Sequence, residues 1–531
     1  MRRATNQDRE VARRYHAATK HTWQSVRSSG HHLDWENKPF PYKVYPDLPV
    51  VPLPRELPVP GVSGLRTIAE AASGEAEPVL DLPRLASLLF FSAGLTKKKT
   101  YPGGETIHFR AAASTGALYE VEVYVVAGEL PGLPAGVYHF CPGDFALRRL
   151  REGDHREPLG KAVAEPDVVR RAPATLVLSA IFWRNTWKYQ ARAYRHCFWD
   201  SGTLLANLLA TATAEGLPAR VLAGFLDDRV DHLLGLDGER EASLVLVPLG
   251  RAGAAPPPVG EIPPLAPPTV PLSREEVDYP DLRAMHAASK LHTPDELRAW
   301  SGPPPWPPAP GGEAVPLQPL PDAEAPDRPL AEVILRRGST RQFAREAIGI
   351  AQLSTILDRA TRGIAADCLG GAGPGLVDLY LIAHAVEGLP AGSYVYVPAG
   401  RGLESLRRGE FRETAGYLCL EQALGADGSV AVFFLADLER VLERYGNRGY
   451  RAAQLEAGIL GGKLYLAAYA LGLGASGTTF YDDEVVKFFA PHAAGKETIF
   501  ATILGRARRA RRGLLAEGRI ERVAPGAPTA G

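Results

Sequence analysis

Hydrophobic and polar positions in the first half of the chain predict a unit of strands packed against a helix. Residues 118–128 alternate between apolar and polar side chains and are rich in β-branched and aromatic types, which predicts a β-strand. Residues 175–182 and 242–250 are almost continuously apolar, as strands buried on both faces are. Residues 202–216 are apolar over too long a stretch for a strand and end at glycine, which predicts a buried helix. Together they predict an α+β fold with a mostly antiparallel sheet.

The same succession of elements returns in the second half of the chain. Apolar runs at 429–436 and 498–505 predict strands, and the run at 457–472 predicts a second long helix that ends at glycine. The segment "AGVYHF" (135–140) pairs with "AGSYVY" (391–396), 256 residues later, and the two predicted helices end at the same spacing. A constant offset with so little gapping indicates tandem duplication.

Proline-rich stretches separate the two copies and predict the domain boundaries, because such stretches favour extended backbone without a packed core. A weaker pair, "YHAATKHT" (15–22) and "MHAASKLH" (285–292), indicates that each copy begins with its own arm. We expect an N-terminal arm over 1–61, a first domain over 62–251, a proline-rich linker with a short helical segment over 252–327, a second domain over 328–507 and a basic tail over 508–531.

Composition and charge narrow the class of protein. The 60 basic and 60 acidic residues give a formal net charge of zero, which argues against a nucleic acid as the partner of the whole chain. The four cysteines are far apart and show no zinc-binding spacing, so we expect reduced thiols, a cytoplasmic protein and no metal site. The N-terminus lacks the apolar segment of a signal peptide, and no run of apolar residues is long enough to cross a membrane.

A basic cluster at 336–343, "RRGSTRQF", is the first candidate for chemistry. Three arginines and a serine at this spacing suit a phosphate, which accepts several charge-assisted hydrogen bonds. The alternative is a solvated arginine turn at the end of a helix. The aligned stretch of the first copy, residues 68–73, has lost every basic group, and the loss of one of two binding sites explains this better than a solvated face does.

Two motifs of the first copy complement this cluster. The stretch "STGALY" (114–119) offers hydroxyl groups and a close approach to the backbone, although an ordinary turn is the alternative. Its counterpart at 370–377 has no hydroxyl. Lys188 and Tyr189 are adjacent titratable groups, and the second copy has Arg444-Tyr445, in which arginine cannot release its proton. A charged helix start is the alternative for this pair.

These motifs carry a resemblance to a known family. "RRGSTRQF" and "ASGTTFYDD" (475–483) resemble the FMN-dependent nitroreductase superfamily. The first copy, with its arm and "STGALY", is more similar to the SagB-type branch, which includes azoline dehydrogenases of modified peptides. The resemblance implies two nitroreductase-like domains that form an intramolecular pseudo-dimer. In the family, two protomers share two FMN sites at their interface.

Carried over residue by residue, the resemblance implies one complete FMN site per chain, because the counterparts of its motifs are degenerate. It implies Lys188 and Tyr189 as the catalytic pair, with Ala113 where the family usually has proline. The cofactor-binding residues that it implies are Ser114, Thr115, Gly116 and Leu118 of the first domain, and Arg336, Arg337, Ser339, Arg341, Gly477, Thr478 and Thr479 of the second, with Arg506 or Arg508 as the basic partner near the C-terminus.

The implied activity is the oxidation of a C–N, C–S or C–O heterocycle, or a related bond, in a peptide or natural-product substrate. We expect the charge of Lys188 to lower the Tyr189 pKa toward neutrality. Two alternatives remain open: reduction of nitroaromatics or quinones by NAD(P)H, and a non-catalytic scaffold of a biosynthetic complex. Neither a nucleic acid nor a membrane is an expected partner, and the pseudo-dimer is compatible with a monomer.

Overall fold

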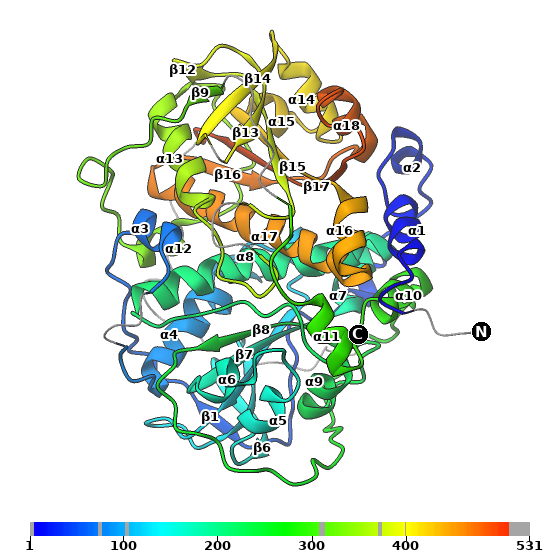
Figure 1. Ribbon diagram of the computed structural model, residues 1–531, viewed down its shortest axis with the longest axis vertical. Helices are drawn as coiled ribbons and strands as arrows, with labels where there is room; N and C mark the ends of the chain where they lie inside the picture. Colours follow the sequence, from blue (N-terminus) through cyan, green and yellow to red (C-terminus); the bar gives the residue numbers. More distant parts are fainter. Residues whose placement is uncertain are drawn as a thin grey trace.

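The computed structural model describes residues 5–72, 77–100, 106–306, 314–369, 374–398 and 400–508. The predicted basic tail therefore lies almost wholly outside the described residues. Figure 1 shows a sheet at each end of the molecule and two long helices that cross between them. This arrangement confirms the predicted α+β fold, duplicated within one chain as an internal pseudo-dimer.

The sheet of the first half is antiparallel throughout its described pairings. The predicted strands at 175–182 and 242–250 form within one residue of the expected bounds, whereas the strand predicted over 118–128 begins only at Val121. In spatial order the strands are β1 (Val50–Pro52), β6 (Ala146–Glu152), β5 (Gly136–Cys141), β4 (Val121–Ala127), β7 (Ala174–Ile181) and β8 (Glu241–Leu249).

The sheet of the second half repeats this topology, with a linker strand in the place of β1, and adds one strand that follows the long helix α17. Its described pairings are antiparallel as well. In spatial order the strands are β16 (Gly474–Gly477), β17 (Glu497–Gly505), β15 (Val430–Ala436), β11 (Asp378–Ala383), β13 (Gly392–Val397), β14 (Gly402–Arg408) and β9 (Ala314–Pro316).

The two long helices form the centre of the pseudo-dimer. Helix α8 (Ala193–Ala214) crosses α17 (Asn447–Ala470), and both begin earlier than the apolar pattern predicts because their first turns carry buried polar side chains. They meet at Gly202 and Gly458, which are 256 residues apart and therefore equivalent in the two copies. A Cβ atom at Gly202 would lie 2.5 Å from the Gly458 carbonyl carbon, so only glycine permits this approach.

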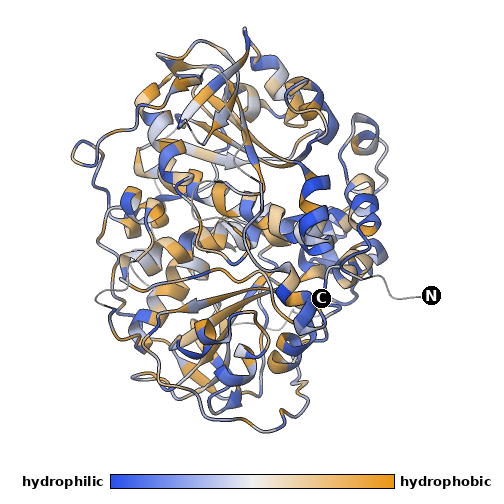
Figure 2. Cartoon of the chain, viewed as in Figure 1, coloured by the Kyte–Doolittle hydropathy of each residue, from blue (hydrophilic) through white to orange (hydrophobic). Residues whose placement is uncertain are grey.

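Shorter helices and hairpins cover the remaining faces. Figure 2 shows hydrophobic residues concentrated in the sheets and central helices and hydrophilic residues on the outer helices. No helix within the described ranges is long and apolar enough to span a bilayer. The other helices are α3 (Gly64–Ala69), α4 (Leu82–Ala93), α5 (Arg156–Gly160), α6 (Pro166–Arg170), α7 (Phe182–Tyr189), α9 (Asp227–Leu234), α12 (Leu330–Arg336), α13 (Ile350–Ala360), α14 (Arg412–Leu418), α15 (Ala423–Asp427), α16 (Leu438–Tyr445) and α18 (Asp482–Phe489). The minor pairings are β2 (Leu95–Thr100) with β3 (Thr106–Arg110) and β10 (Ile348–Gly349) with β12 (Val386–Glu387).

Each copy has an arm that packs against both copies. The N-terminal arm contains α1 (Glu10–Ala18) and α2 (Trp23–Arg27), and the linker contains α10 (Pro280–Ala288) and α11 (Pro294–Trp300). Figure 1 shows α1 and α2 beside α16 at one side of the molecule.

A buried cluster of two arginines and one aspartate anchors each arm. At the first arm, Arg195 donates to Asp482 at 2.7 Å and to the His16 carbonyl at 2.7 Å. At the second arm, Arg451 donates to Asp227 and to the His286 carbonyl, both at 2.9 Å. The duplication therefore extends to the arms. Arg192 and Arg448 complete the two clusters.

Candidate active site

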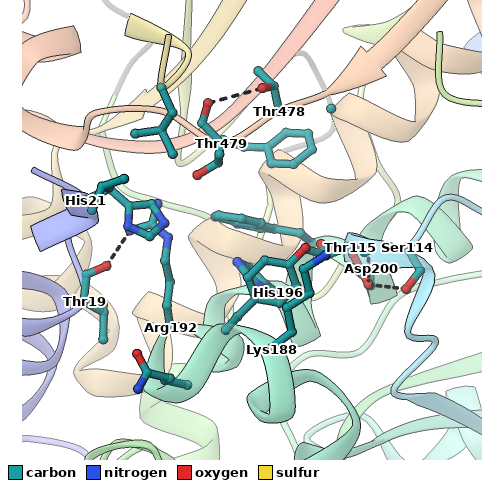
Figure 3. Close-up of a pocket in the computed structure, with 18 of the residues that line it drawn as sticks. Thr19, His21, Ser114, Thr115, Lys188, Arg192, His196, Asp200, Thr478 and Thr479 are labelled. Carbon is teal, nitrogen blue, oxygen red and sulfur yellow. Dashed lines mark hydrogen bonds between the residues drawn. The ribbon is translucent and has the colours of Figure 1, made fainter. Parts of the chain in front are cut away.

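A cavity of about 630 Å³ opens between the two halves on the side of the N-terminal arm. Figure 3 shows side chains from three parts of the chain pointing into it: the arm, the first copy and the second copy. The arm contributes the wall around Thr19 and His21, the first copy contributes the end of α7 and the start of α8, and the second copy contributes Thr478 and Thr479. A ligand in this cavity therefore contacts both copies at once.

Most of the residues implied by the family resemblance line this one cavity, although they are separated by up to several hundred positions in the sequence. From the first copy they are Ser114, Thr115, Gly116, Lys188 and Tyr189, and from the second copy Ser339, Arg341, Gly477, Thr478 and Thr479.

The other implied residues lie away from the cavity lining. Arg336 is exposed and pairs with Glu332 within its own helix. Leu118 is buried against Trp183 and Trp187. The Arg506 guanidinium donates to the Ala347 carbonyl at 3.1 Å, and the Arg508 amide donates to the Gln342 carbonyl at 3.0 Å.

Arg337 does not line the cavity either, but its side chain joins the two copies. Its side chain is buried, and its guanidinium donates to the carbonyl oxygens of Ala111 at 2.9 Å and Arg110 at 3.3 Å. Both carbonyls belong to the segment that leads into "STGALY". This arginine therefore fixes the basic cluster at 336–343, here called the clamp, against the first copy's loop at 114–119. The neighbouring Ser339 and Arg341 reach the cavity.

The loop at Ser114–Gly116 is held by a carboxylate on α8. Asp200 accepts the Ser114 hydroxyl at 2.6 Å, the Thr115 amide at 2.7 Å and the Thr115 hydroxyl at 2.8 Å. The protons of both hydroxyls are thus committed to Asp200, so the oxygens present lone pairs. Gly116 has a φ of 65°, and a Cβ atom there would lie 2.9 Å from the Tyr189 hydroxyl oxygen. Glycine is required at this approach.

The Lys188–Tyr189 pair lies at the C-terminal end of α7, beside this loop. The Lys188 ammonium lies 5.4 Å from the centre of the Tyr189 ring. Burial, together with the positive charges of Arg341 and Lys38, lowers the pKa of Lys188 below its ordinary value. Burial also raises the pKa of Tyr189, as do the nearby Asp200 and Glu120. The expectation that Lys188 brings the Tyr189 pKa toward neutrality is therefore wrong, because desolvation and two acidic neighbours favour the neutral phenol.

The opposite wall of the cavity is aromatic. The rings of Trp199 and Phe500 lie 5.3 Å apart, one from each copy. The Tyr465 hydroxyl accepts the Gly477 amide and lies 3.2 Å from the Ser339 hydroxyl, so it ties the turn after α17 to the clamp. Among the described residues, neither Lys188 nor Arg341 has a carboxylate partner, and the cavity therefore favours an anionic ligand with a flat apolar part.

Several cavity residues were missed by reasoning from the sequence. Tyr465 lies within the predicted apolar helix at 457–472 and Asp200 lies just before the one at 202–216, so an isolated polar residue is the only signal available. His21 and His196 are both neutral, because burial and the charge of Arg192 lower the His21 pKa to about 3 and burial and the same arginine depress that of His196.

The equivalent region on the other side of the pseudo-dimer is largely filled by the chain itself. Trp300 at the end of α11 is 2% exposed, and a Cβ atom at Gly224 would lie 2.6 Å from its indole ring. The indole lies 5.5 Å from the ring of Tyr445, the counterpart of Tyr189. Beside it, the Asp367 carboxylate accepts the Gly224 amide at 2.8 Å. A cavity of about 210 Å³ remains near residues 67–72.

Arg444 and Tyr445 are the counterpart of the Lys188–Tyr189 pair. They hold residues 299–302, the filling segment, by the main-chain carbonyl groups of that segment. Arg444 donates to the carbonyl oxygens of Ala299 and Ser301, both at 2.9 Å. The Tyr445 hydroxyl donates to the Gly302 carbonyl, also at 2.9 Å. In the second copy, then, this pair of residues binds backbone carbonyl groups that occupy the region in front of it.

Comparison with known proteins assigns both copies to one family. The sequence model of the nitroreductase family matches residues 65–251 and 334–505, which together are more than half of the chain. A crystal structure from Anabaena variabilis, named as a nitroreductase, is 26% identical and superposes with a TM-score of 0.74 over 94% of this chain and 99% of its own. The tandem arrangement is therefore present in that protein as well.

Curated relatives match parts of the chain. A Methanocaldococcus jannaschii protein named as a nitroreductase is 27% identical over 172 residues, which are 32% of this chain and 81% of the relative. The microcin B17-processing protein McbC of Escherichia coli is 30% identical over 26% of this chain and 52% of its own length. The trifolitoxin-processing protein TfxB of Rhizobium leguminosarum is 27% identical over 42% of this chain and 62% of its own length. The match to the two processing proteins thus spans between half and two thirds of their lengths.

Proposed function

The chain belongs to the nitroreductase family of oxidoreductases, and on that premise we propose that it is an FMN-dependent dehydrogenase or oxidase that acts on a peptide or natural-product substrate. The observation that carries the proposal is the meeting of three motifs at one cavity: Ser339 and Arg341 from the clamp, the Ser114–Gly116 loop, and the Lys188–Tyr189 pair. The first copy supplies the loop and the pair, and the second copy supplies the clamp.

The cavity has the groups that a flavin nucleotide requires. Arg341 is a cation without a carboxylate partner among the described residues, and it suits the anionic or polar edge of the nucleotide. Trp199 and Phe500 offer an apolar wall for a flat ring. When bound, FMN supplies two-electron redox chemistry, while the protein orients the reactants.

We propose a single cofactor per chain, with its cavity on the side of the N-terminal arm. In support of this, Trp300 and Asp367 fill much of the equivalent region on the other side. The counterpart of the clamp there, residues 68–72, contains no basic side chain. A second flavin would need both the filling segment to leave and a phosphate site that those residues do not provide.

The two members of the catalytic pair have different tasks in this proposal. Tyr189 has a raised pKa, so its phenol stays protonated at neutral pH and donates a hydrogen bond. Lys188 has a lowered pKa, so a larger fraction of it is the neutral amine at neutral pH than for an exposed lysine, and only the neutral amine can accept a proton. We therefore assign removal of the substrate proton to Lys188 and positioning of a substrate acceptor atom to Tyr189.

The second copy indicates which acceptor atom Tyr189 would hold. There Arg444 and Tyr445 bind three backbone carbonyl oxygens of the chain's own segment 299–302. By analogy, Tyr189 would bind an amide or related carbonyl group of the substrate. The names of McbC and TfxB, which are processing proteins of peptide products, support a modified peptide.

A reductase that uses NAD(P)H is the second candidate, favoured by the relative named as a nitroreductase, of which the match covers 81%. Rapid loss of flavin colour on addition of NADPH alone, without a peptide, would favour it.

The proposal is tested by the absorption spectrum of the purified protein. Bound flavin absorbs at about 450 nm, and we expect one flavin per chain. Arg341→Gln should lose most of the flavin, whereas the matched variant Arg336→Gln should retain it because Arg336 lies outside the cavity and pairs with Glu332. A colourless protein, or two flavins per chain, would contradict the proposal.

A further inference from the structure

The two arms can be compared residue by residue, because the same helix start occurs in both. Thr22 caps α2 in a capping box with Ser25, and Thr293 caps α11 in a capping box with Glu296. "YHAATKHT" and "MHAASKLHT" align with a single insertion, Leu291, so the offset is 271 residues after this point. At that offset Val26 matches Leu297, Arg27 matches Arg298, and Ser29 matches Trp300.

Both arms continue past these helices along the end of the helix that carries the catalytic pair or its counterpart. In the second copy, the Gly302 carbonyl accepts the Tyr445 hydroxyl at the end of α16. In the first copy, the residue at the same offset is His31, and its Nε2 lies 3.1 Å from the Trp187 carbonyl in α7. The two segments are thus docked in equivalent places, and the comparison of Ser29 with Trp300 is one of position as well as of sequence.

The two equivalent residues have opposite effects on the space in front of the pair. Trp300 places its indole against Tyr445 and Gly224 and helps to fill that region. Ser29 lines the open cavity that also contains Tyr189. Next to it, a Cβ atom at Gly30 would meet no other atom within 4 Å, so the arm leaves room here. The small Ser29 therefore occupies the position at which the filled copy has Trp300, the largest side chain.

We infer that Ser29 of the N-terminal arm is a specificity-determining residue: its small side chain keeps the substrate space of the cavity open, and the arm sets the size of the group admitted. This inference rests on the proposed function and deepens it. Because an indole occupies the equivalent space in the other copy, the first copy admits a flat substrate group about as large as a fused two-ring system. A tryptophan at position 29 should close this space to such a group.

The test compares Ser29→Trp with Ser28→Trp in the flavin-loaded protein. Both serines are exposed at the surface, so neither substitution should prevent folding, but only Ser29 lines the cavity. After reduction with dithionite, reoxidation is followed by stopped flow with 1,4-naphthoquinone, which has two fused rings, and with the single-ring p-benzoquinone. We expect Ser29→Trp to slow the naphthoquinone reaction about tenfold or more relative to benzoquinone. Ser28→Trp should leave the ratio of the two rates unchanged.

A second readout separates this inference from the proposed function. The rate at which a bulky acylating reagent modifies Lys188, read by mass spectrometry, reports access to the cavity whether or not flavin is bound. If the protein proves colourless but Ser29→Trp still protects Lys188 and Ser28→Trp does not, the inference stands and the FMN proposal fails. Equal quinone ratios and equal Lys188 modification in the two variants would overturn the inference even in a flavin-loaded protein.

Discussion

At the scale of single residues, the site depends on buried charges whose partners come from distant positions. Asp200 orders the loop at 114–116, and its counterpart Glu456 accepts the amides of Gly375, Leu376 and Val377 in the second copy. Neither carboxylate was predicted from the sequence, because each lies just before a predicted apolar helix and belongs to no motif. The loop itself was predictable as a motif, but the group that fixes its hydroxyl protons was not.

The charges around Lys188 give a prediction about its pKa. Arg341 and Lys38 are both positive and both lower the Lys188 pKa, Arg341 more strongly. Removing either charge stabilises the ammonium form, so the pKa of Lys188 should rise, more in Arg341→Gln than in Lys38→Gln. The measurement is the pH dependence of Lys188 acetylation by mass spectrometry, in which the rise in rate moves to higher pH.

Arg336→Gln is the control for this measurement. Its guanidinium is exposed and paired with Glu332, and it is not among the charges that lower the Lys188 pKa. A shift in this variant as large as that of Lys38→Gln would mean that the net charge of the surface, and not the local cavity, governs Lys188.

At the scale of elements, each arm is a structural part that joins the two copies. The cluster of Arg192, Arg195 and Asp482 joins α8, α18 and the end of α1, and its counterpart repeats the arrangement with Asp227. Burial alone would raise the pKa of Asp482, but the two guanidinium groups outweigh it and hold that pKa far below its ordinary value. The arms were predictable as a weak repeat, whereas their anchoring required the fold.

Loss of one aspartate should destabilise the protein strongly. Asp482→Asn leaves two buried guanidinium groups without a counter-charge, and we expect it to lower the free energy of unfolding by about 3–5 kcal/mol. Asp227→Asn should have a similar effect, because its cluster has the same composition. The measurement is chemical denaturation, followed by far-ultraviolet circular dichroism.

An exposed ion pair provides the comparison. Glu165 pairs with Arg220 at the surface, so Glu165→Gln should change stability by less than about 1 kcal/mol. If Asp482→Asn proved as mild as this variant, the buried cluster would not be what holds the arm.

At the scale of the whole molecule, the pseudo-dimer depends on the crossing of α8 and α17. The helices touch backbone to backbone at Gly202 and Gly458, and Gly462 lies close to Ala206 and Thr203 further along. This contact sets the distance between the two copies and therefore the width of a cavity that takes its walls from both.

A methyl group at the crossing should affect both the fold and the site. Gly202→Ala places its Cβ 2.5 Å from backbone atoms, which no rotamer change relieves, and we expect a loss of stability of about 1–3 kcal/mol or more. The flavin-to-chain ratio should fall in parallel, since the helices must separate. Gly30→Ala is the matched control, because its Cβ would contact nothing and its φ is ordinary, and it should leave both unchanged. A stable Gly202→Ala variant with full flavin content would show that the copies tolerate separation.

The sequence by itself determined the duplication, the α+β class and the motifs that each copy kept, because periodicity and a constant offset are properties of the chain alone. Only the tertiary structure decided which motif residues meet. Leu118 and Arg336 belong to the same motifs as Ser114 and Arg341, yet they face the core and the solvent, since neighbouring residues of a turn or helix end point in different directions. Likewise, only packing raised the Tyr189 pKa and filled the second region with Trp300, because burial and contact between distant segments have no signature in local sequence.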